Sequence, residues 1–246
     1  MKLKVLDERY RSLLETIREH FHEAKQSIWD KRNKIKIVHF GDKEITVKLF
    51  KTPHMINKLA YTFVRPSKAA RSYENSLRIK AFVPLPIGYV EYKKFGLIHD
   101  SYFVSEHYNY DFTIREPLSQ KEFPDKEAIL EQFAHFTYRL HEAGVEHLDY
   151  SPGNILIKQI SKDQYECKVI DVNRMKFRDL TMQERLENFA KLWADDEDLS
   201  IIISAYTQMR GGDRTKAIDI ARKASQQHKE KTNLKKKLKG KKVVSS

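Results

Sequence analysis

The sequence predicts a mixed α+β fold, with strands gathered in the front half of the chain and helices in the back half. Its 246 residues correspond to one domain or to two closely joined lobes, at about 100–200 residues per domain. Hydrophobic residues make up 40% and aromatic residues 11%, which is enough apolar content for a buried core even with 33% charged residues. No internal repeat is visible.

The first 50 residues predict a helix followed by a hairpin. Apolar residues recur at spacings of three and four between Leu6 and Ala24, so residues 1–27 are interpreted as an amphipathic N-terminal helix of about six turns. The β-rich runs 34–40 and 44–50 flank a turn that contains Gly41, which is typical of a hairpin. Residues 26–29 are a candidate third strand.

The next segment, through residue 108, completes a strand-rich lobe with one central helix. Residues 67–79 have a helical composition, and Pro84 and Pro86 end that region. Extended stretches follow at 88–92 and 102–106. We therefore expect a small lobe over residues 28–108 that is built mainly of strands.

Helices dominate the segment 109–228, which we interpret as a second lobe of reduced size. Ile129, Phe133, Phe136 and Leu140 mark one face of a long helix over 125–143, which Gly144 ends. A polar loop, two short strands at 155–157 and 168–170, and further helices come after it.

Positive charge is concentrated at the end of the chain. With 46 basic and 34 acidic residues the formal net charge is +12, which favours a polyanionic partner: nucleic acid, a phosphorylated substrate or anionic lipid. Residues 229–246 hold eight lysines against the single acid Glu230, and we interpret them as a disordered basic tail. Such a tail serves as a solubility segment or as a contact for a membrane or nucleic acid.

Several classes of protein are excluded. The single cysteine, Cys167, rules out an internal disulfide and a zinc site with several cysteines. No apolar run approaches the ~18–20 residues that cross a bilayer, and acidic residues interrupt the N-terminus before a signal-type stretch can form. We expect a cytoplasmic protein.

The most informative stretch is His147-Leu148-Asp149-Tyr150-Ser151-Pro152-Gly153-Asn154, on a loop between a helix and an apolar strand. With Asp171 at the end of a second strand, it matches the H-x-D-x-x-x-x-N pattern and its following metal-binding aspartate. Phosphoryl transfer needs a carboxylate near the nucleophile and oxygen ligands for Mg²⁺. We therefore interpret Asp149 as the catalytic base, Asn154 and Asp171 as metal ligands, and His147 as a support for the loop. The alternative is a turn in which these residues only cap and bend.

A lysine in the front lobe supplies the matching cation. Lys48 lies inside the apolar strand 46–50, where an ammonium needs a partner or an anion to offset its desolvation. Glu74, on the helix 67–79, stands where kinases keep the acid that pairs with this lysine. We expect Lys48 on the α- and β-phosphates of a nucleotide, positioned by Glu74. Lys48 as an edge-strand lysine that prevents aggregation is the alternative.

Two further positions are candidates for nucleotide contacts. No G-x-G-x-x-G precedes Lys48, so Arg32, with Lys31 and Asn33, is proposed to contact phosphates through side chains in place of glycine amides. An ordinary charged turn is the alternative there. Glu106 and His107 stand at the end of the predicted strand 102–106 and mark the location of an adenine-binding hinge.

These motifs resemble the lipopolysaccharide core kinases, the Kdo (3-deoxy-D-manno-octulosonic acid) and heptose kinases of Gram-negative bacteria. The resemblance rests on Arg32-Asn33, on the segments 47–51, 67–74 and 147–154, and on Ile170-Asp171-Val172-Asn173-Arg174-Met175, within roughly residues 28–192. It implies a two-lobed protein-kinase-like fold, ATP and Mg²⁺ as cofactors, and a lipid-linked saccharide as substrate. It also implies a location at the cytoplasmic face of the inner membrane. We expect the basic tail to hold the enzyme at this anionic surface, as a peripheral membrane protein.

Departures from protein kinases favour a small-molecule acceptor. Asp171-Val172-Asn173 replaces D-F-G, Leu148 replaces the arginine of the catalytic loop, and no Ala-Pro-Glu follows. The expected function is thus phosphorylation of an inner-core sugar hydroxyl. Alternatives are a soluble sugar or aminoglycoside kinase, a pseudokinase, and a module that binds nucleic acid through the basic tail. The intact catalytic set argues against a pseudokinase, and nucleic acid is not the expected partner. The sequence leaves the oligomeric state open.

Overall fold

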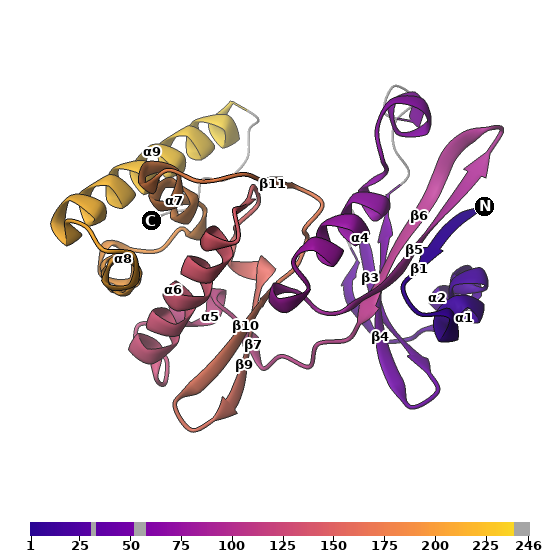
Figure 1. The fold of residues 1–246 in the computed structure, drawn as a ribbon, viewed down its shortest axis with the longest axis horizontal. Coiled ribbons are helices and arrows are strands. Elements are labelled where there is room, and N and C mark those ends of the chain that lie inside the picture. Colours follow the sequence, from indigo (N-terminus) through magenta and orange to yellow (C-terminus); the bar gives the residue numbers. More distant parts are fainter. Residues whose placement is uncertain (31–32, 52–57, 239–246) are drawn as a thin grey trace. The chain divides into compact units, whose positions relative to one another are not determined.

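The computed structural model describes residues 1–30, 33–51 and 58–238 and divides the chain into two compact units (Figure 1). The first unit comprises Met1–Asn109 together with Asp171–Asn173. The second comprises Tyr110–Ile170 and Arg174–Ser246. The mixed α+β class is confirmed, because a β-rich unit is followed by a largely helical one.

A six-stranded antiparallel sheet forms the centre of the first unit. Its strands, in the spatial order β1-β5-β6-β4-β3-β2, are β1 (Lys2–Val5), β5 (Pro86–Lys94), β6 (Leu97–Glu106), β4 (Lys43–Phe50), β3 (Lys34–Phe40) and β2 (Ser27–Asp30). The predicted hairpin and its third strand are confirmed. Gly41 has a φ of +62°, a conformation that glycine adopts without strain, and Lys43 already belongs to β4.

The N-terminal segment is not one continuous helix, and that prediction was wrong. After β1 come a short 3-10 turn (Glu8–Tyr10), α1 (Arg11–Glu15) and α2 (Ile17–Glu23). The helix is interrupted at Thr16, whose φ and ψ are −106° and 18° and whose hydroxyl donates to the Ser12 carbonyl at 2.8 Å. A threonine hydroxyl that bonds to the preceding turn competes with the helical backbone. The apolar spacing survives, because both helices bury the same face.

Two hydrophobic clusters cover opposite faces of this sheet. Leu13, Leu14, Ile17 and Phe21 pack with strand residues that include Ile45 and Val47 of β4. On the other face, α4 (Lys68–Arg78) packs through Ala69, Ala70 and Tyr73 against Phe50 and Tyr89. Because successive strand residues alternate between faces, Lys48 shares the face of Phe50 and α4.

The second unit combines α6 (Lys126–Glu142) with two small sheets. Strands β7 (Phe112–Thr113), β9 (Ile155–Ser161) and β10 (Gln164–Val169) form one sheet, and β8 (Val145–His147) pairs with β11 (Met175–Phe177) in the other. A 3-10 turn, Pro152–Asn154, leads directly into β9. The predicted helix over 125–143 and both predicted short strands are therefore present, and the strands are longer than expected.

Further helical segments of the second unit are α5 (Arg115–Ser119), α7 (Met182–Asn188), a 3-10 segment called η5 (Phe189–Leu192), α8 (Asp196–Arg210) and α9 (Arg214–Lys237). In the first unit, η2 (Ala60–Val64) precedes α4 and η3 (Lys80–Phe82) follows it. Residues 229–237, expected to be disordered, are the last turns of α9. Asp213 caps this helix, and Ala217, Ala221 and Ser225 form a buried stripe at a spacing of four. Lys229 Nζ donates to the Ala194 carbonyl at 2.9 Å. Residues 239–246 of the expected tail lie outside the described residues.

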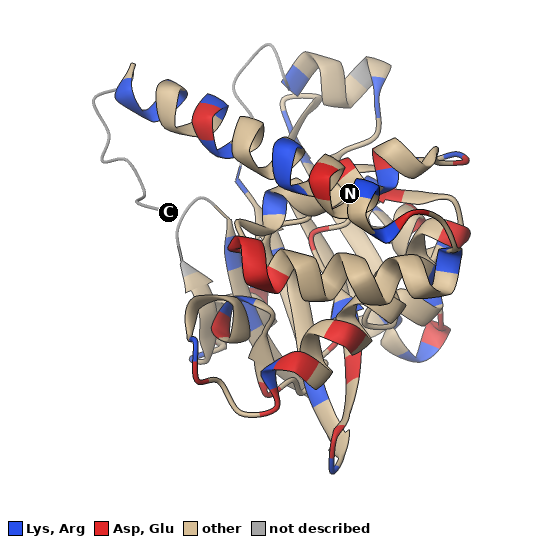
Figure 2. Cartoon of the chain, turned by 90° about the vertical axis from the view of Figure 1, so that its left-hand side faces the viewer, with Lys and Arg blue, Asp and Glu red and all other residues tan. Residues whose placement is uncertain are grey.

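Blue lysine and arginine segments recur along α9 as it leads to the C-terminus (Figure 2). Across residues 1–30, 33–51 and 58–238, no helix combines the length and the apolar character needed to span a bilayer.

Candidate active site

Lys48 and Asp171 form an ion pair inside the first unit. The Lys48 Nζ lies 2.9 Å from Asp171 Oδ1, and the two side chains are only 13% and 26% exposed. The ammonium also lies 5.2 Å from the centre of the Phe50 ring. A poorly hydrated ammonium needs such an anionic partner. The strand lysine is therefore held beside the aspartate that follows β10.

The short segment that carries Asp171 is fastened to the first unit at a second point. Asn75 of α4 donates its Nδ2 to the Val172 carbonyl at 2.6 Å. Asn173 Nδ2 also donates to Asp171 Oδ1. Asp171 has a φ of +59°, a left-handed conformation that costs free energy in a residue other than glycine. Strain of this kind is concentrated at functional sites.

Glu74 does not pair with Lys48 in this structure. Its Oε1 lies 2.7 Å from Lys4 Nζ, in an ion pair whose side chains are 54% (Lys4) and 48% (Glu74) exposed. The hydrogen bond to Glu74 raises the pKa of Lys4. The Lys48 ammonium is turned to Asp171 instead, and Lys4 of β1 reaches the carboxylate of Glu74. The role of Glu74 beside Lys48 stays a prediction.

Glu106 and His107 lie where the sequence placed them, at the end of β6. The Glu106 carboxylate pairs with Lys43 Nζ at 3.0 Å, and His107 Nδ1 is 3.0 Å from the Thr46 hydroxyl. Their backbone N–H groups donate to the carbonyls of Leu85 and Glu44. Burial lowers the pKa of His107.

Of the proposed phosphate-contacting turn, Lys31 and Arg32 lie outside the described residues. Asn33 is described, and its Oδ1 accepts from the backbone N–H of Lys51 at 3.4 Å.

In the second unit, His147 holds the loop that carries Asp149. Its Nδ1 accepts from the Asp149 backbone N–H at 3.0 Å, and its Nε2 donates to the Ile170 carbonyl at 3.0 Å. An imidazole that accepts at Nδ1 and donates at Nε2 is neutral and in a single tautomer. One buried ring thereby connects the backbone at Asp149 to the residue directly before Asp171.

Asn154 makes a second connection within the same loop. Its Nδ2 donates to the Asp149 carbonyl at 2.8 Å, and its own carbonyl accepts from the Ile170 N–H at 2.9 Å. Because the amide nitrogen is used to hold the loop, the amide oxygen Oδ1 is the atom available to a ligand.

Two residues that support the loop were not predicted. Tyr150 is fully buried, its hydroxyl lies 2.7 Å from Thr137 Oγ1, and burial raises its pKa. Asn188 donates its Nδ2 to the His147 carbonyl at 3.1 Å. The aromatic character of Tyr150 beside the motif was a usable signal, whereas Asn188 carries none in the sequence.

The Asp149 carboxylate is 42% exposed and has a cation beside it. Arg174 Nη1 lies 3.6 Å from Asp149 Oδ2, and the Arg174 side chain is 61% exposed. The pairing of β8 with β11 brings them together, since Arg174 immediately precedes β11 and accepts the Leu148 N–H through its carbonyl at 2.9 Å. Arg174 stood in the quoted motif without a role. Its geometry places an exposed positive charge next to the proposed base.

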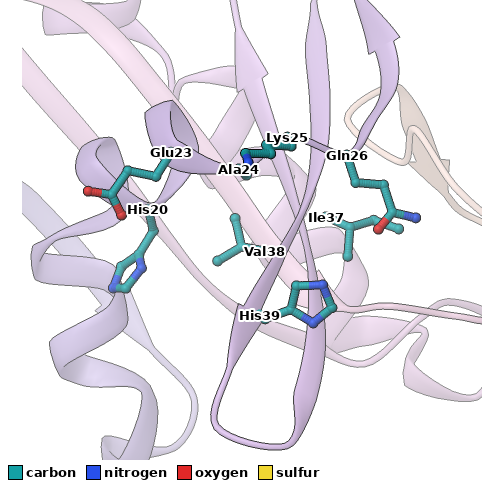
Figure 3. A pocket seen from close by; sticks show the side chains of 8 residues that line it. All are labelled: His20, Glu23, Ala24, Lys25, Gln26, Ile37, Val38 and His39. Atoms are coloured by element: carbon teal, nitrogen blue, oxygen red, sulfur yellow. The ribbon is translucent and has the colours of Figure 1, made fainter.

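A hollow elsewhere in the first unit contains none of these residues. It lies between α2 and β3, with His20 and Glu23 on the helix and His39 on the strand (Figure 3). The hollow is therefore separate from the candidate active site. Over the described ranges, no group of three or more His, Cys, Asp or Glu side chains is arranged to hold a metal ion.

Comparisons with known proteins identify the family and the fold of the chain. Residues 28–207 match the family model described as "Lipopolysaccharide kinase (Kdo/WaaP) family". The fold is similar to that of the solved structure "WaaP in complex with acyl carrier protein", with a TM-score of 0.60, 17% identity, and coverage of 92% of this chain and 99% of that one.

A MAP kinase, LmaMPK10 from Leishmania major, aligns with a TM-score of 0.46 and 14% identity, covering 85% of this chain and 66% of that one. No curated protein sequence matches the chain. The resemblance inferred from the motifs is confirmed by the family model, as is the kinase-like fold by the match to WaaP. The chain belongs to the lipopolysaccharide kinase (Kdo/WaaP) family and is a kinase that phosphorylates a sugar hydroxyl.

Proposed function

We propose that this kinase uses ATP and Mg²⁺ to phosphorylate a Kdo or heptose hydroxyl of the lipopolysaccharide inner core. The reaction would take place at the cytoplasmic face of the inner membrane of a Gram-negative bacterium. The observation that carries the proposal is the fixed loop in which His147 and Asn154 hold Asp149, on a chain matched by the family model.

Asp149 is the proposed base. Its carboxylate is partly exposed, whereas its backbone is held on both sides, at the N–H by His147 and at the carbonyl by Asn154. A carboxylate with a fixed backbone and an accessible side chain suits the orientation of an incoming hydroxyl and the acceptance of its proton. His147 acts as a positioning residue, through the hydrogen bonds of its ring to the backbone of Asp149 and Ile170.

Lys48 is the proposed ligand of the α- and β-phosphates. It is poorly exposed and already holds an anion, the carboxylate of Asp171. Phosphate oxygens offer the same kind of partner. Arg32 is proposed to add a second cation. Glu74, once it is released from Lys4, is proposed to position Lys48. The end of β6 at Glu106 and His107 is proposed to lie against the adenine.

The oxygen atoms of Asn154 and Asp171 fit Mg²⁺, which prefers hard oxygen ligands and binds few protein groups at once. Asn154 offers Oδ1 because its Nδ2 is engaged, and Asp171 offers carboxylate oxygens close to Lys48. When bound, Mg²⁺ would neutralise the charge of the phosphates during transfer.

The basic end of α9 supports a location at an anionic membrane. Lys231, Lys235 and Lys237 are exposed on the last turns of this helix. Lysines near an anionic leaflet contribute about 1 kcal/mol each. The helix would then bring the enzyme to the lipid-linked saccharide that we propose as its substrate.

The direct test is phosphate transfer by the purified full chain with ATP and Mg²⁺. Lipid A carrying Kdo and heptose, free sugars and an aminoglycoside serve as acceptors, and mass spectrometry detects the gain of about 80 Da for one phosphoryl group. We expect transfer to the lipid-linked acceptor, lowered about 10²–10⁴-fold in Asp149→Asn. Asp163→Asn, at an exposed hairpin turn, is the control. Transfer to the soluble acceptors alone would contradict the proposal, as would full activity in Asp149→Asn.

A further inference from the structure

Lys191 occupies a special position beside the catalytic loop. It lies on η5, which begins directly after Asn188, the residue whose side chain donates to the His147 carbonyl. In a 3-10 helix, residues three apart lie on the same side. Lys191 is three positions after Asn188, so it lies on the side of η5 that faces the loop of His147 and Asp149.

The ammonium of Lys191 is half-buried and lacks a fixed partner among the described residues. Within the part of the chain that the structure describes, it makes no hydrogen bond and no ion pair. Burial lowers its pKa, the carboxylates of Glu146 and Asp149 raise it, and the cations of Arg174 and Lys176 lower it. A lysine in such surroundings loses hydration without gaining a compensating contact.

The neighbouring carboxylates are already engaged by other cations. Glu146 Oε2 lies 3.0 Å from Arg178 Nη2 and 3.6 Å from Lys176 Nζ. Asp149 Oδ2 lies 3.6 Å from Arg174 Nη1. Glu184 also pairs with Arg178, at 2.7 Å. Counting Lys191, four cations therefore stand against three carboxylates. The surroundings of Asp149 therefore hold an excess of positive charge.

We propose that Lys191, with Arg174 and Lys176, forms a binding subsite for an anionic group of the sugar acceptor, a carboxylate or a phosphate close to the hydroxyl that is phosphorylated. The inference rests on the proposed function and adds the residue that selects an acidic acceptor. An anion at this place gives the Lys191 ammonium the partner that the protein does not supply. It also draws Arg174 away from Asp149, which frees the carboxylate to receive the hydroxyl.

The same positive charge is not needed for ATP, whose α- and β-phosphates are assigned to Lys48 in the first unit. Lys191 should therefore act on the acceptor and not on the nucleotide. Because the two lysines have different proposed ligands, replacing Lys191 should change KM for the acceptor and leave KM for ATP nearly unchanged.

The kinetic test uses Lys191→Met, Lys191→Arg and the control Lys223→Met, an exposed lysine of α9. Acceptors are Kdo-linked lipid A, the same molecule with its carboxylates converted to amides, and the amide form without lipid A phosphates. We expect Lys191→Met to raise KM for the intact acceptor about tenfold, the usual effect of losing one charged hydrogen bond. KM for ATP should stay within twofold, and Lys191→Arg should restore most of the affinity. The amides reveal whether the carboxylate or the phosphate is bound.

A second readout does not depend on turnover. Trp193 is two residues from Lys191, and in a Trp29→Phe background it is the only tryptophan. Its fluorescence is followed while free Kdo or inorganic phosphate is added. Binding that disappears in Lys191→Met and survives in Lys223→Met supports the subsite. If such binding is seen but no saccharide is phosphorylated, the proposed function is wrong and the subsite stands. Turnover with unchanged KM for the acceptor in Lys191→Met overturns the subsite and leaves the function standing. If neither turnover nor Lys191-dependent anion binding is observed, both the subsite and the proposed function are wrong.

Discussion

The ammonium of Lys48 lies 2.9 Å from the Oδ1 atom of Asp171, so one carboxylate oxygen joins the central strand β4 to the segment that follows β10. Each residue has a separate proposed task, the lysine on phosphates and the aspartate on Mg²⁺. Their contact means that replacing either one leaves the other with a poorly hydrated charge.

Replacement of Lys48 by methionine should impair the use of ATP. The aliphatic chain keeps its packing near Phe50, while the phosphates lose their cation. We expect kcat/KM for ATP to fall by about 10²-fold or more, a loss of about 3 kcal/mol of transition-state stabilisation. Initial rates over a range of ATP concentrations measure it. Lys51→Met, at the exposed residue just after β4, is the matched control, and an equal loss in both variants would contradict the assignment.

Asn154→Ala should raise the Mg²⁺ concentration that gives half-maximal activity. The variant loses the proposed metal ligand Oδ1 and the hydrogen bond to the Asp149 carbonyl. Loss of a group that only supports a ligand typically costs 10–100-fold in metal affinity, so we expect a shift of at least about tenfold. Asn154→Asp keeps an oxygen ligand and should shift the titration less than alanine does. An unchanged Mg²⁺ titration in Asn154→Ala would remove the residue from the metal site.

Acid should destabilise the second unit through His141. This ring is buried between Tyr206 and Asn188, and burial lowers its pKa to about 4 from 6.5. Between about pH 4 and pH 6.5 His141 is protonated in the unfolded chain and neutral in the folded chain. Stability is therefore fully present above about pH 6.5 and falls by about 3 kcal/mol as the pH drops to about 4.

Urea unfolding at several pH values measures this slope. His141→Gln should lower the free energy of unfolding at pH 7 and make it less dependent on pH, whereas His135→Gln, at an exposed position of α6, should leave the slope unchanged. A slope that is the same in all three proteins would show that His141 is not the titrating group.

Gly88→Ala should destabilise the first unit. A Cβ at this position of β5 would lie 2.4 Å from both the Lys4 carbonyl oxygen and Leu14 Cδ2. The carbonyl belongs to the backbone of β1 and cannot turn aside, so we expect a loss near the upper end of the ~1–3 kcal/mol that overpacking costs. Gly96→Ala, with a φ of +76° and open space around it, should cost only about 1 kcal/mol. Equal midpoints of urea unfolding in the two variants would contradict the close approach of β1.

Binding to anionic vesicles should depend on the exposed lysines at the end of α9. Replacement of Lys231, Lys235 and Lys237 by glutamine keeps the buried stripe of the helix intact and removes charge only. We expect about tenfold weaker binding, or more, to vesicles that contain anionic lipid, and unchanged turnover of a soluble acceptor. The control replaces Lys216 and Lys223, in the first half of the same helix, by glutamine. Sedimentation with vesicles measures binding, and equal binding of both variants would exclude this end of α9 as the contact.

Local patterns were sufficient to predict most of the fold. The alternating runs around Gly41 predict the strands β3 and β4, and the apolar face of residues 125–143 predicts the helix α6. Such patterns are informative because one face of each element is buried. The pattern between Leu6 and Ala24 gave the buried face correctly and missed the interruption at Thr16. That interruption comes from a hydroxyl that bonds to the backbone, which a hydrophobic pattern does not record.

The candidate site was predictable only where a motif carries it. Asp149, Asn154 and Asp171 stand at fixed spacings, and His147 precedes them. The partner of Glu74 was not predictable, because Lys4 reaches it only after β1 has paired with β5. Lys191 was missed for a similar reason: its importance lies in what surrounds it in space, and nothing in the residues next to it in the sequence reveals an unpartnered cation.

The placement of β1 gives the first five residues an influence on how copies of this protein associate. β1 is the outermost strand of its sheet, and it covers the long, buried strand β5. A chain that lacked Lys2–Val5 would present β5 as an open edge, whose unpaired backbone groups invite strand addition and aggregation. It would also free the Glu74 carboxylate from Lys4. Shortening the N-terminus would thus alter solubility and the charge on α4 in a single step.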